Sequence, residues 1–255
     1  MRLLRAVIVV LLLINHVCLT LVAKLLIRDE QTRRRFFLRK ATNFSRRFFH
    51  LLHVELVIEN PERLRVNENY LWLANHMSYL DALILASLRP VCFVTSMEMK
   101  QVPVLGLLTE LGGCLYTERR SKENLRGEVA QLAQALLDGF DIAIFPEGTS
   151  TNGTGILPFK RGLITAAMDA KKSILPITIQ YQEIEGKKVN TGNRDLLCWY
   201  GDMSFAPHFF KLILLKSVKI RVRILPELLM TDRESRDSLV AAAFEAIKAN
   251  YEPIQ

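Results

Sequence analysis

Residues 70–81 read YLWLANHMSYLD and are the stretch that decides the fold. The first five form a short apolar run that is typical of a buried strand, and an apolar helical pattern begins at Asp81 after the polar turn. Residues 141–149, DIAIFPEGT, show the same change from an apolar run to a polar turn. Apolar runs that alternate with helical patterns indicate an α/β fold.

This alternation continues from about residue 54 to the end of the chain. We expect strands at 54–59, 70–74, 91–95, 114–117, 141–145, 174–181 and 219–225, and helices at 81–88, 103–111, 124–137, 161–171, 207–215 and 233–249. The polar stretch 182–197 predicts a surface loop. No linker or repeat is visible, so we predict an N-terminal helical segment at 1–52 and one α/β domain at 53–255.

The positive charge of the chain is concentrated near its N-terminus. Of the net +8, residues 1–27 contribute +3 from three basic residues, and residues 28–47 contribute +6 from eight basic residues against two acids, which leaves −1 for the rest. A nucleic-acid-binding protein usually spreads its basic residues over the folded surface, so we expect no nucleic-acid partner. With 50% hydrophobic and 24% charged residues, long disordered tails are excluded. The four separated cysteines predict free thiols.

Residues 6–23 contain no charged residue, and as a helix they would be about 27 Å long, close to the thickness of a hydrocarbon core. A membrane helix is the preferred interpretation. The alternatives are a buried helix and a cleaved signal peptide, and the latter is disfavoured because no small-x-small cleavage site follows. The positive-inside rule places the basic cluster and the domain after it on the cytoplasmic side.

A second helical pattern follows this stretch. Five apolar residues recur at spacings of 4, 3, 4 and 3 and therefore share one helical face, with basic residues around it: Phe37, Ala41, Phe44, Phe48 and Leu51. A basic helix with an aromatic face suits an anionic lipid interface. The alternative is a helix whose apolar face packs into a protein core and whose charged side is solvated.

Polar residues follow three of the predicted strands, at 75–81, 118–120 and 146–149. In an open α/β sheet the carboxyl ends of the strands line the ligand crevice, so we expect these segments to converge on one site. The motifs GxSxG, HExxH, GxGxxG and the Walker phosphate loop are absent. His50 and His53 have no third ligand nearby in the sequence, so we predict no metal site.

His76 and Asp81 are the candidate catalytic pair. Five residues apart, they do not share a helix face, but they meet if His76 lies in the turn and Asp81 in the first turn of the helix. Asp81 would then hold the imidazole in one tautomer, and the other ring nitrogen could take a proton from a hydroxyl. Ser78 and Asp81 also fit a capping box, in which Asp81 only stabilises the start of the helix. Both interpretations stay open.

The turn after the strand at 141–145 supplies further candidates. Glu147 and Thr149 follow the strand directly, in a turn fixed by Pro146 and Gly148. Glu147 would either hydrogen-bond the loop backbone or contact substrate. Arg119 is the candidate anion clamp, and the alternative is an ordinary surface arginine.

Together these motifs resemble the glycerophospholipid (lysophospholipid) acyltransferase family over residues 70–181 and in the family's order. The His-x4-Asp motif matches 75–81, the motif from glycine to arginine matches 113–119, the FPEGT block matches 145–149, the LPFK stretch matches 157–160 and the proline motif matches 174–177. The resemblance implies an acyltransferase-type mixed sheet flanked by helices. It also implies a membrane-bound enzyme that moves a fatty acyl group from acyl-CoA or acyl carrier protein to the hydroxyl of a lyso-lipid, without a cofactor.

In this resemblance His76 is the general base, Asp81 orients it, and the acceptor contacts are Arg119, Glu147, Gly148 and Thr149. Two other classes of function remain as alternatives. A lipid ester hydrolase would need a serine nucleophile on an elbow, and the sequence has none. A non-catalytic lipid-binding protein would not account for the ordered motifs.

The chain departs from the phosphatidate-forming members at two places. Ser150 stands where those members usually have arginine, and Ser96 and Met97 stand where they tend to have lysines that help to hold the acceptor's phosphate. These departures predict that lysophosphatidate is a poor acceptor. The runs at 149–153 and 199–202 resemble members that acylate other lyso-lipids, including lyso-ornithine lipids.

Overall fold

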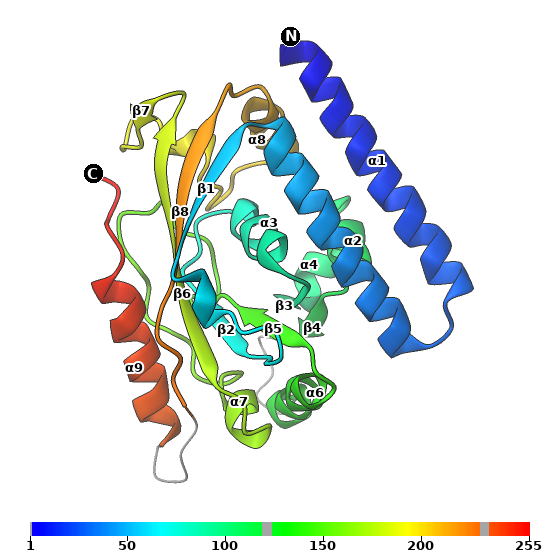
Figure 1. Ribbon diagram of the computed structural model, residues 1–255, viewed down its shortest axis with the longest axis vertical. Helices are drawn as coiled ribbons and strands as arrows, with labels where there is room; N and C mark the ends of the chain where they lie inside the picture. Colours follow the sequence, from blue (N-terminus) through cyan, green and yellow to red (C-terminus); the bar gives the residue numbers. More distant parts are fainter. Residues whose placement is uncertain (1, 119–123, 230–234) are drawn as a thin grey trace.

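A mixed β-sheet forms the centre of the computed structural model, which describes residues 2–118, 124–229 and 235–255 (Figure 1). Within these residues the sheet has eight strands in the order β1-β8-β6-β2-β5-β3-β4, and β7 pairs with the end of β6. The strands are β1 Val54–Glu59, β2 Leu71–Ala74, β3 Val91–Ser96, β4 Leu115–Thr117, β5 Asp141–Ile144, β6 Ile174–Ile184, β7 Lys187–Lys188 and β8 Val218–Ile224. All seven predicted strands are present, each within three residues of its expected ends.

Five neighbouring strands run parallel, namely β6, β2, β5, β3 and β4. Their carboxyl ends therefore lie at one edge of the sheet. Leu73 of β2 pairs with Ile144 of β5, which brings the turn after β2 next to the turn after β5. This register puts the two most distinctive sequence motifs side by side.

The predicted surface loop at 182–197 is partly wrong. β6 continues to Ile184 and turns through Glu185 and Gly186 into the two-residue strand β7. Both turn residues have positive φ, 52° and 77°, which is the geometry of a two-residue hairpin turn that favours glycine. The rest of the segment is irregular apart from a 3₁₀ turn at Arg194–Leu196.

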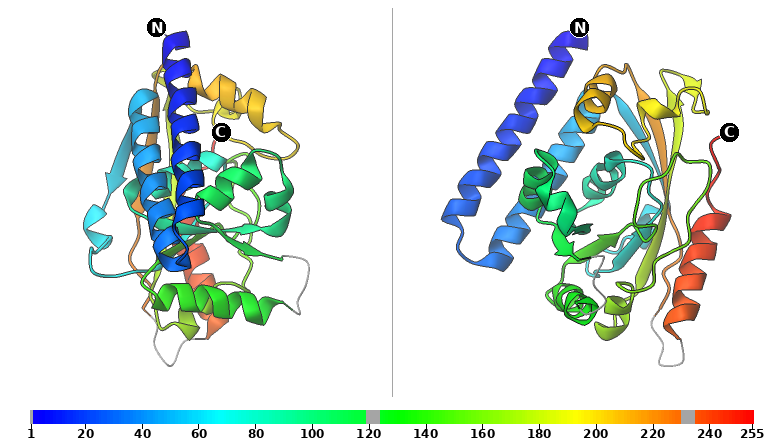
Figure 2. Two further views of the ribbon diagram at one scale, coloured as in Figure 1. Left: turned by 90° about the vertical axis from the view of Figure 1, so that its right-hand side faces the viewer. Right: turned by 180° about the vertical axis from the view of Figure 1, so that it is seen from behind.

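Helices cover both faces of the sheet (Figures 1 and 2). They are α1 Arg2–Leu26, α2 Glu30–Leu51, α3 Tyr79–Leu88, α4 Met97–Gln101, α5 Leu105–Leu111, α6 Leu125–Leu137, α7 Thr165–Asp169, α8 Phe205–Ile213 and α9 Arg236–Ala249. Helices α6, α7 and α9 lie on one face, and α2 and α3 lie on the other with α1 outside them. The short α4 was not predicted, and α7 is shorter than the predicted helix at 161–171.

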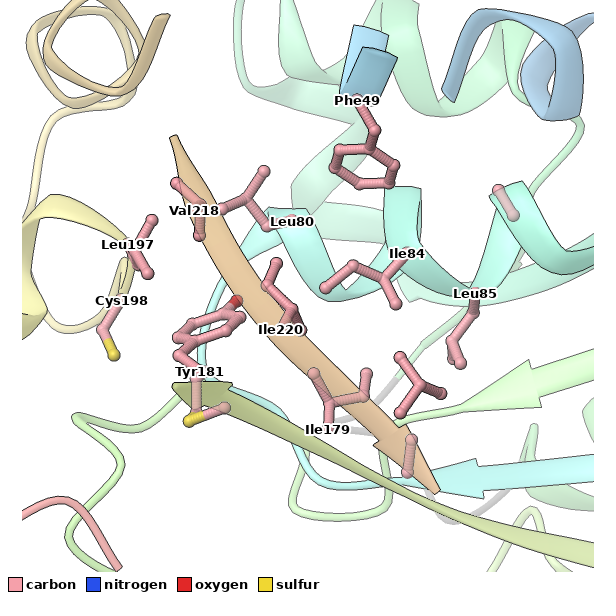
Figure 3. Packing of buried hydrophobic residues seen from close by; sticks show 14 of the residues in the cluster. Phe49, Leu80, Ile84, Leu85, Ile179, Tyr181, Leu197, Cys198, Val218 and Ile220 are labelled. Atoms are coloured by element: carbon pink, nitrogen blue, oxygen red, sulfur yellow. The ribbon is translucent and has the colours of Figure 1, made fainter. Parts of the chain in front are cut away.

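A large hydrophobic core lies between the sheet and the helices α2 and α3. Phe49 of α2, Ile84 of α3 and Ile220 of β8 are all within this core, as Figure 3 shows. Ala6 and Val9 of α1 belong to the same core. Helices α1 and α2 are therefore packed against the α/β domain and share its core.

The aromatic face predicted for α2 points inward. Phe37 and Phe48 are buried, and Phe44 packs against the core between α1 and α3. Of the two interpretations of this helix, the structure supports the one in which the apolar face packs into a protein core. Several basic side chains of α2 also bind the domain: Arg35 donates to the carbonyl of Asp138, and Arg46 to the carbonyls of Ser87 and Leu88.

Helix α1 has the length and composition of a membrane helix, and it is the one helix in the described part of the chain that has both. Most of its outer side chains are exposed, including Leu11 at 58% and Leu25 at 82%. Both of its ends are attached to the domain. Arg5 donates to the backbone carbonyls of Leu215 and Lys216 after α8, and the ammonium of Lys24 lies 2.6 Å from the carboxylate of Glu110 in α5.

Candidate active site

The turn between β2 and α3 brings His76 and Asp81 together. The Nδ1 atom of His76 lies 2.9 Å from Oδ2 of Asp81. The Asp81 side chain is fully buried, whereas the His76 side chain is 21% exposed. The carboxylate occupies Nδ1 and leaves Nε2 as the other ring nitrogen, to which no described residue hydrogen-bonds.

Asp81 also caps α3. Its Oδ2 accepts hydrogen bonds from the backbone N–H groups of Met77 at 2.6 Å and Ser78 at 2.8 Å, and a capping box with Ser78 is present. The two interpretations of this motif are thus compatible, because one oxygen serves both the helix start and the imidazole. Oδ1 accepts the hydroxyl of Tyr181 at 2.6 Å. Burial and the charge of Asp81 raise the pKa of Tyr181, so this hydroxyl remains a donor.

Tyr181 lies 100 residues from Asp81, and its role was not predicted from the sequence. It reaches Asp81 because β6 runs beside β2. Asn75, also missed, fastens the turn to the same strand: its side chain exchanges two hydrogen bonds with the backbone of Ile179, at 2.8 and 3.0 Å. The sequence contains the signal of a polar residue directly after a buried strand, but not the identity of its partner.

Glu147 joins the two neighbouring turns. One carboxylate oxygen accepts the backbone N–H of His76 at 2.7 Å, and the other accepts that of Leu157 at 2.8 Å. The residue is only 3% exposed, and burial raises the pKa of its carboxyl group to about 7. In this geometry Glu147 bonds loop backbone, and Thr151 adds two hydrogen bonds to the carbonyl of His76.

Aromatic rings support the imidazole from one side. The ring of Phe145 stacks on His76 at 4.0 Å between centroids with an interplanar angle of 11°, and Phe93 stacks behind Phe145 at 6.2 Å. The ring of His76 is thus held by a carboxylate at its edge and by a phenyl ring on its face. Both contacts restrict the rotation of the imidazole ring.

A charged cavity of about 260 Å³ opens beyond Phe145, at the carboxyl ends of β3, β4 and β5. Gly148 and Lys160 line it, and Thr149 lies exposed beside Gly148. Gly148 has φ of +75°, and a Cβ atom there would come within 2.5 Å of the ammonium nitrogen of Lys160. The predicted anion clamp, Arg119, lies outside the described residues.

An apolar cavity of about 190 Å³ lies on the other side, between α1, α2, α3, α5 and α8. Its lining is mostly aliphatic and aromatic and includes Phe93, Tyr79 and Leu105. Phe93 therefore connects this cavity to the stack of rings that ends at His76. Within the part of the chain that the structure describes, no group of three His, Cys, Asp or Glu side chains is arranged to hold a metal ion.

The fold and this site define an α/β protein with a His-Asp pair at the carboxyl edge of a mixed sheet. A family model described as Acyltransferase matches residues 55–180. The lyso-ornithine lipid O-acyltransferase of Rhizobium meliloti is 33% identical over 142 residues, which are 53% of this chain and 49% of that protein. The chain belongs to the glycerophospholipid acyltransferase family of enzymes.

Two further relatives cover more of the chain. The 1-acyl-sn-glycerol-3-phosphate acyltransferase of Neisseria meningitidis is 28% identical over 69% of this chain and 67% of that protein, and the lyso-ornithine lipid O-acyltransferase of Brucella abortus is 26% identical over 84% and 85%. The crystal structure of the 1-acyl-sn-glycerophosphate acyltransferase of Thermotoga maritima superposes with a TM-score of 0.67 over 98% of this chain and 96% of that one. At 19% identity this likeness shows the fold, including the mixed sheet flanked by helices that the sequence predicted.

Proposed function

We propose that the protein transfers a fatty acyl group from a thioester, acyl-CoA or acyl carrier protein, to the free hydroxyl of a membrane lyso-lipid, with His76 as the general base. The observation that supports this most directly is the 2.9 Å contact between Nδ1 of His76 and the buried carboxylate of Asp81. It leaves Nε2 for the proton of the acceptor hydroxyl. The names of the relatives support a lyso-lipid as acceptor.

In the proposed reaction Nε2 of His76 removes the hydroxyl proton as the oxygen attacks the thioester carbonyl carbon. The negative charge of Asp81 stabilises the imidazolium that forms. The tetrahedral intermediate collapses, the carbon–sulfur bond breaks, and the imidazolium returns the proton to the leaving thiolate. No acyl-enzyme intermediate is part of this mechanism, so the enzyme's work is positioning and proton transfer.

The apolar cavity fits the acyl chain. Each CH₂ group of a fatty chain that moves from water into apolar surroundings contributes about 0.8 kcal/mol to the free energy of binding. A cavity lined by aliphatic and aromatic side chains provides such surroundings. The cavity begins at Phe93, two stacked rings away from His76. We therefore assign part of the acyl chain of the donor to this cavity.

We place the enzyme on the cytoplasmic face of a membrane, with α1 lying in the interface and not crossing it. Arg5 and Lys24, near opposite ends of α1, both contact the catalytic domain, so both ends lie on the side of the bilayer where the domain is. The exposed leucines of α1 would then enter the lipid. The basic residues near the N-terminus favour the cytoplasmic side.

The test is acyl transfer by the purified protein in lipid nanodiscs, with a radiolabelled acyl thioester and a panel of lyso-lipids. His76→Ala should lower the transfer rate by about 10²–10⁴-fold while the melting temperature stays near that of the wild type. His50→Ala, on the exposed side of α2, is the matched control and should retain full activity. Release of free fatty acid without transfer would point to a hydrolase, and near wild-type transfer by His76→Ala would refute the proposed base.

A further inference from the structure

The charged cavity contains side chains of both signs. Among the described residues that line it, Lys160 is the cation, and Glu118 and Glu128 are the anions. A carboxylate in this lining would attract the ammonium group of a ligand, and the ammonium of Lys160 would attract an anionic group.

Lys160 is positioned over the turn that follows β5. Its aliphatic chain and ammonium lie where a Cβ atom of residue 148 would be, at 2.5 to 2.9 Å, so Gly148 is required for this placement. The backbone N–H of Lys160 donates to the carbonyl of Pro146 at 2.8 Å, which fixes the residue relative to Phe145. Lys160 is therefore suited to bind an anionic group in the cavity that Phe145 also lines.

Glu128 faces the same cavity from the first turn of α6 and is half-buried. One of its carboxylate oxygens accepts the backbone N–H of Glu118, which holds the carboxylate at the rim. A carboxylate has about four acceptor positions, so this bond leaves capacity for the N–H groups of a ligand. Holding the loop would need only a neutral acceptor, and glutamine would supply one.

We propose that this cavity recognises an acceptor headgroup that has both an anionic group and an ammonium group, and that Glu128 is the residue that selects for the ammonium. The proposal rests on the proposed acyl transfer to a lyso-lipid and names the class of that lipid. Lys160 binds the anionic group and Glu128 the ammonium. Phe145 lines the same cavity, and its ring stacks on His76, so a headgroup bound in the cavity contacts the residue that supports the base.

The experiment compares acceptors that differ in one charge. The probes are an ornithine-containing lyso-lipid, the same lipid with its amino group acetylated, and lysophosphatidate. The value of kcat/KM with each lipid is measured for three proteins: the wild type, Glu128→Gln and Glu245→Gln. Glu245 is an exposed glutamate of α9, so the last variant is the control. Glutamine at 128 keeps an acceptor for the loop N–H and removes only the charge, so the fold should be preserved.

We expect the wild type and Glu245→Gln to prefer the free amine over the acetylated lipid by about tenfold or more, as one charge-assisted hydrogen bond predicts. In Glu128→Gln this ratio should fall to near one, with little change for the acetylated lipid. Equal loss with both lipids would make Glu128 structural and overturn the inference while acyl transfer stands. A wild type that ignores the amine, or prefers lysophosphatidate, would also overturn it. Transfer to no lyso-lipid at all would refute the proposed function and the inference with it.

Discussion

Asp81→Asn separates the capping of α3 from the proposed catalytic role of the same carboxylate. Asp81 accepts hydrogen bonds from the His76 ring, from two backbone N–H groups and from Tyr181. Asparagine can place its carbonyl oxygen at the Oδ2 position, where three of these donors converge. Its NH₂ group then faces Tyr181, whose hydroxyl can turn and accept. The fold should therefore survive the substitution.

The magnitudes follow from the loss of the charge. Hydrogen bonds to a charged group contribute about 1.5–3 kcal/mol and neutral ones about 0.5–1.5 kcal/mol, so we expect a stability loss of about 1–3 kcal/mol, or a few degrees in Tm. The effect on turnover should be much larger, because the imidazolium that forms during transfer loses its counter-charge. We expect a fall of about 10²–10⁴-fold in kcat.

Ser78→Ala is the matched control, since it removes the other half of the capping box and leaves the carboxylate in place. It should lower stability by about 1 kcal/mol and leave turnover near that of the wild type. The measurements are thermal unfolding and initial transfer rates on the same preparations. An Asp81→Asn variant that loses stability but keeps near wild-type turnover would refute the catalytic role and leave only the helix cap.

Two further predictions concern the turn after β5. Ser150→Arg adds a cation for the phosphate, so it should raise the use of lysophosphatidate relative to other lyso-lipids by about ten- to a hundredfold in a competition assay. An unchanged ratio of the two products would contradict this prediction. Burial raises the pKa of Glu147 from 4.5 to about 7, so the folded state binds more protons than the unfolded state between these values. The free energy of unfolding of the wild type, relative to that of Glu147→Gln, should therefore decrease by about 3 kcal/mol as pH rises through this window. Urea unfolding of both proteins at each end of the window measures this change. The same difference between the two proteins at both pH values would contradict the prediction.

Most of the seven predicted strands are short apolar runs, and β8 could be predicted because its apolar residues alternate with Lys219, Arg221 and Arg223. The hairpin that ends β6 was missed because Glu185 and Gly186 lie within a polar stretch, and polarity alone does not distinguish a loop from an exposed strand pair. Helix α4 was missed for a similar reason. It has five residues and is too short to show a periodic pattern.

The site was predicted in part. Proximity of His76 and Asp81 follows from their spacing and from the helix that begins between them. The two roles considered for Glu147 could not be separated in the sequence, since the hydrogen bond from His76 to Glu147 joins residues 71 positions apart. Periodicity also could not decide what the aromatic face of α2 contacts. A helix has the same pattern whether its apolar face meets lipid or a protein core.

The attachment of α1 at both ends has a geometric consequence for substrate choice. A catalytic domain on a flexible tether would sample many heights above a bilayer, whereas here α1 contacts the domain near both of its ends and shares its core. In the proposed placement of α1 in the interface, these contacts hold His76 at one depth relative to the lipid headgroups. The depth of the free hydroxyl below the membrane surface would then select the acceptor in addition to the chemistry of its headgroup.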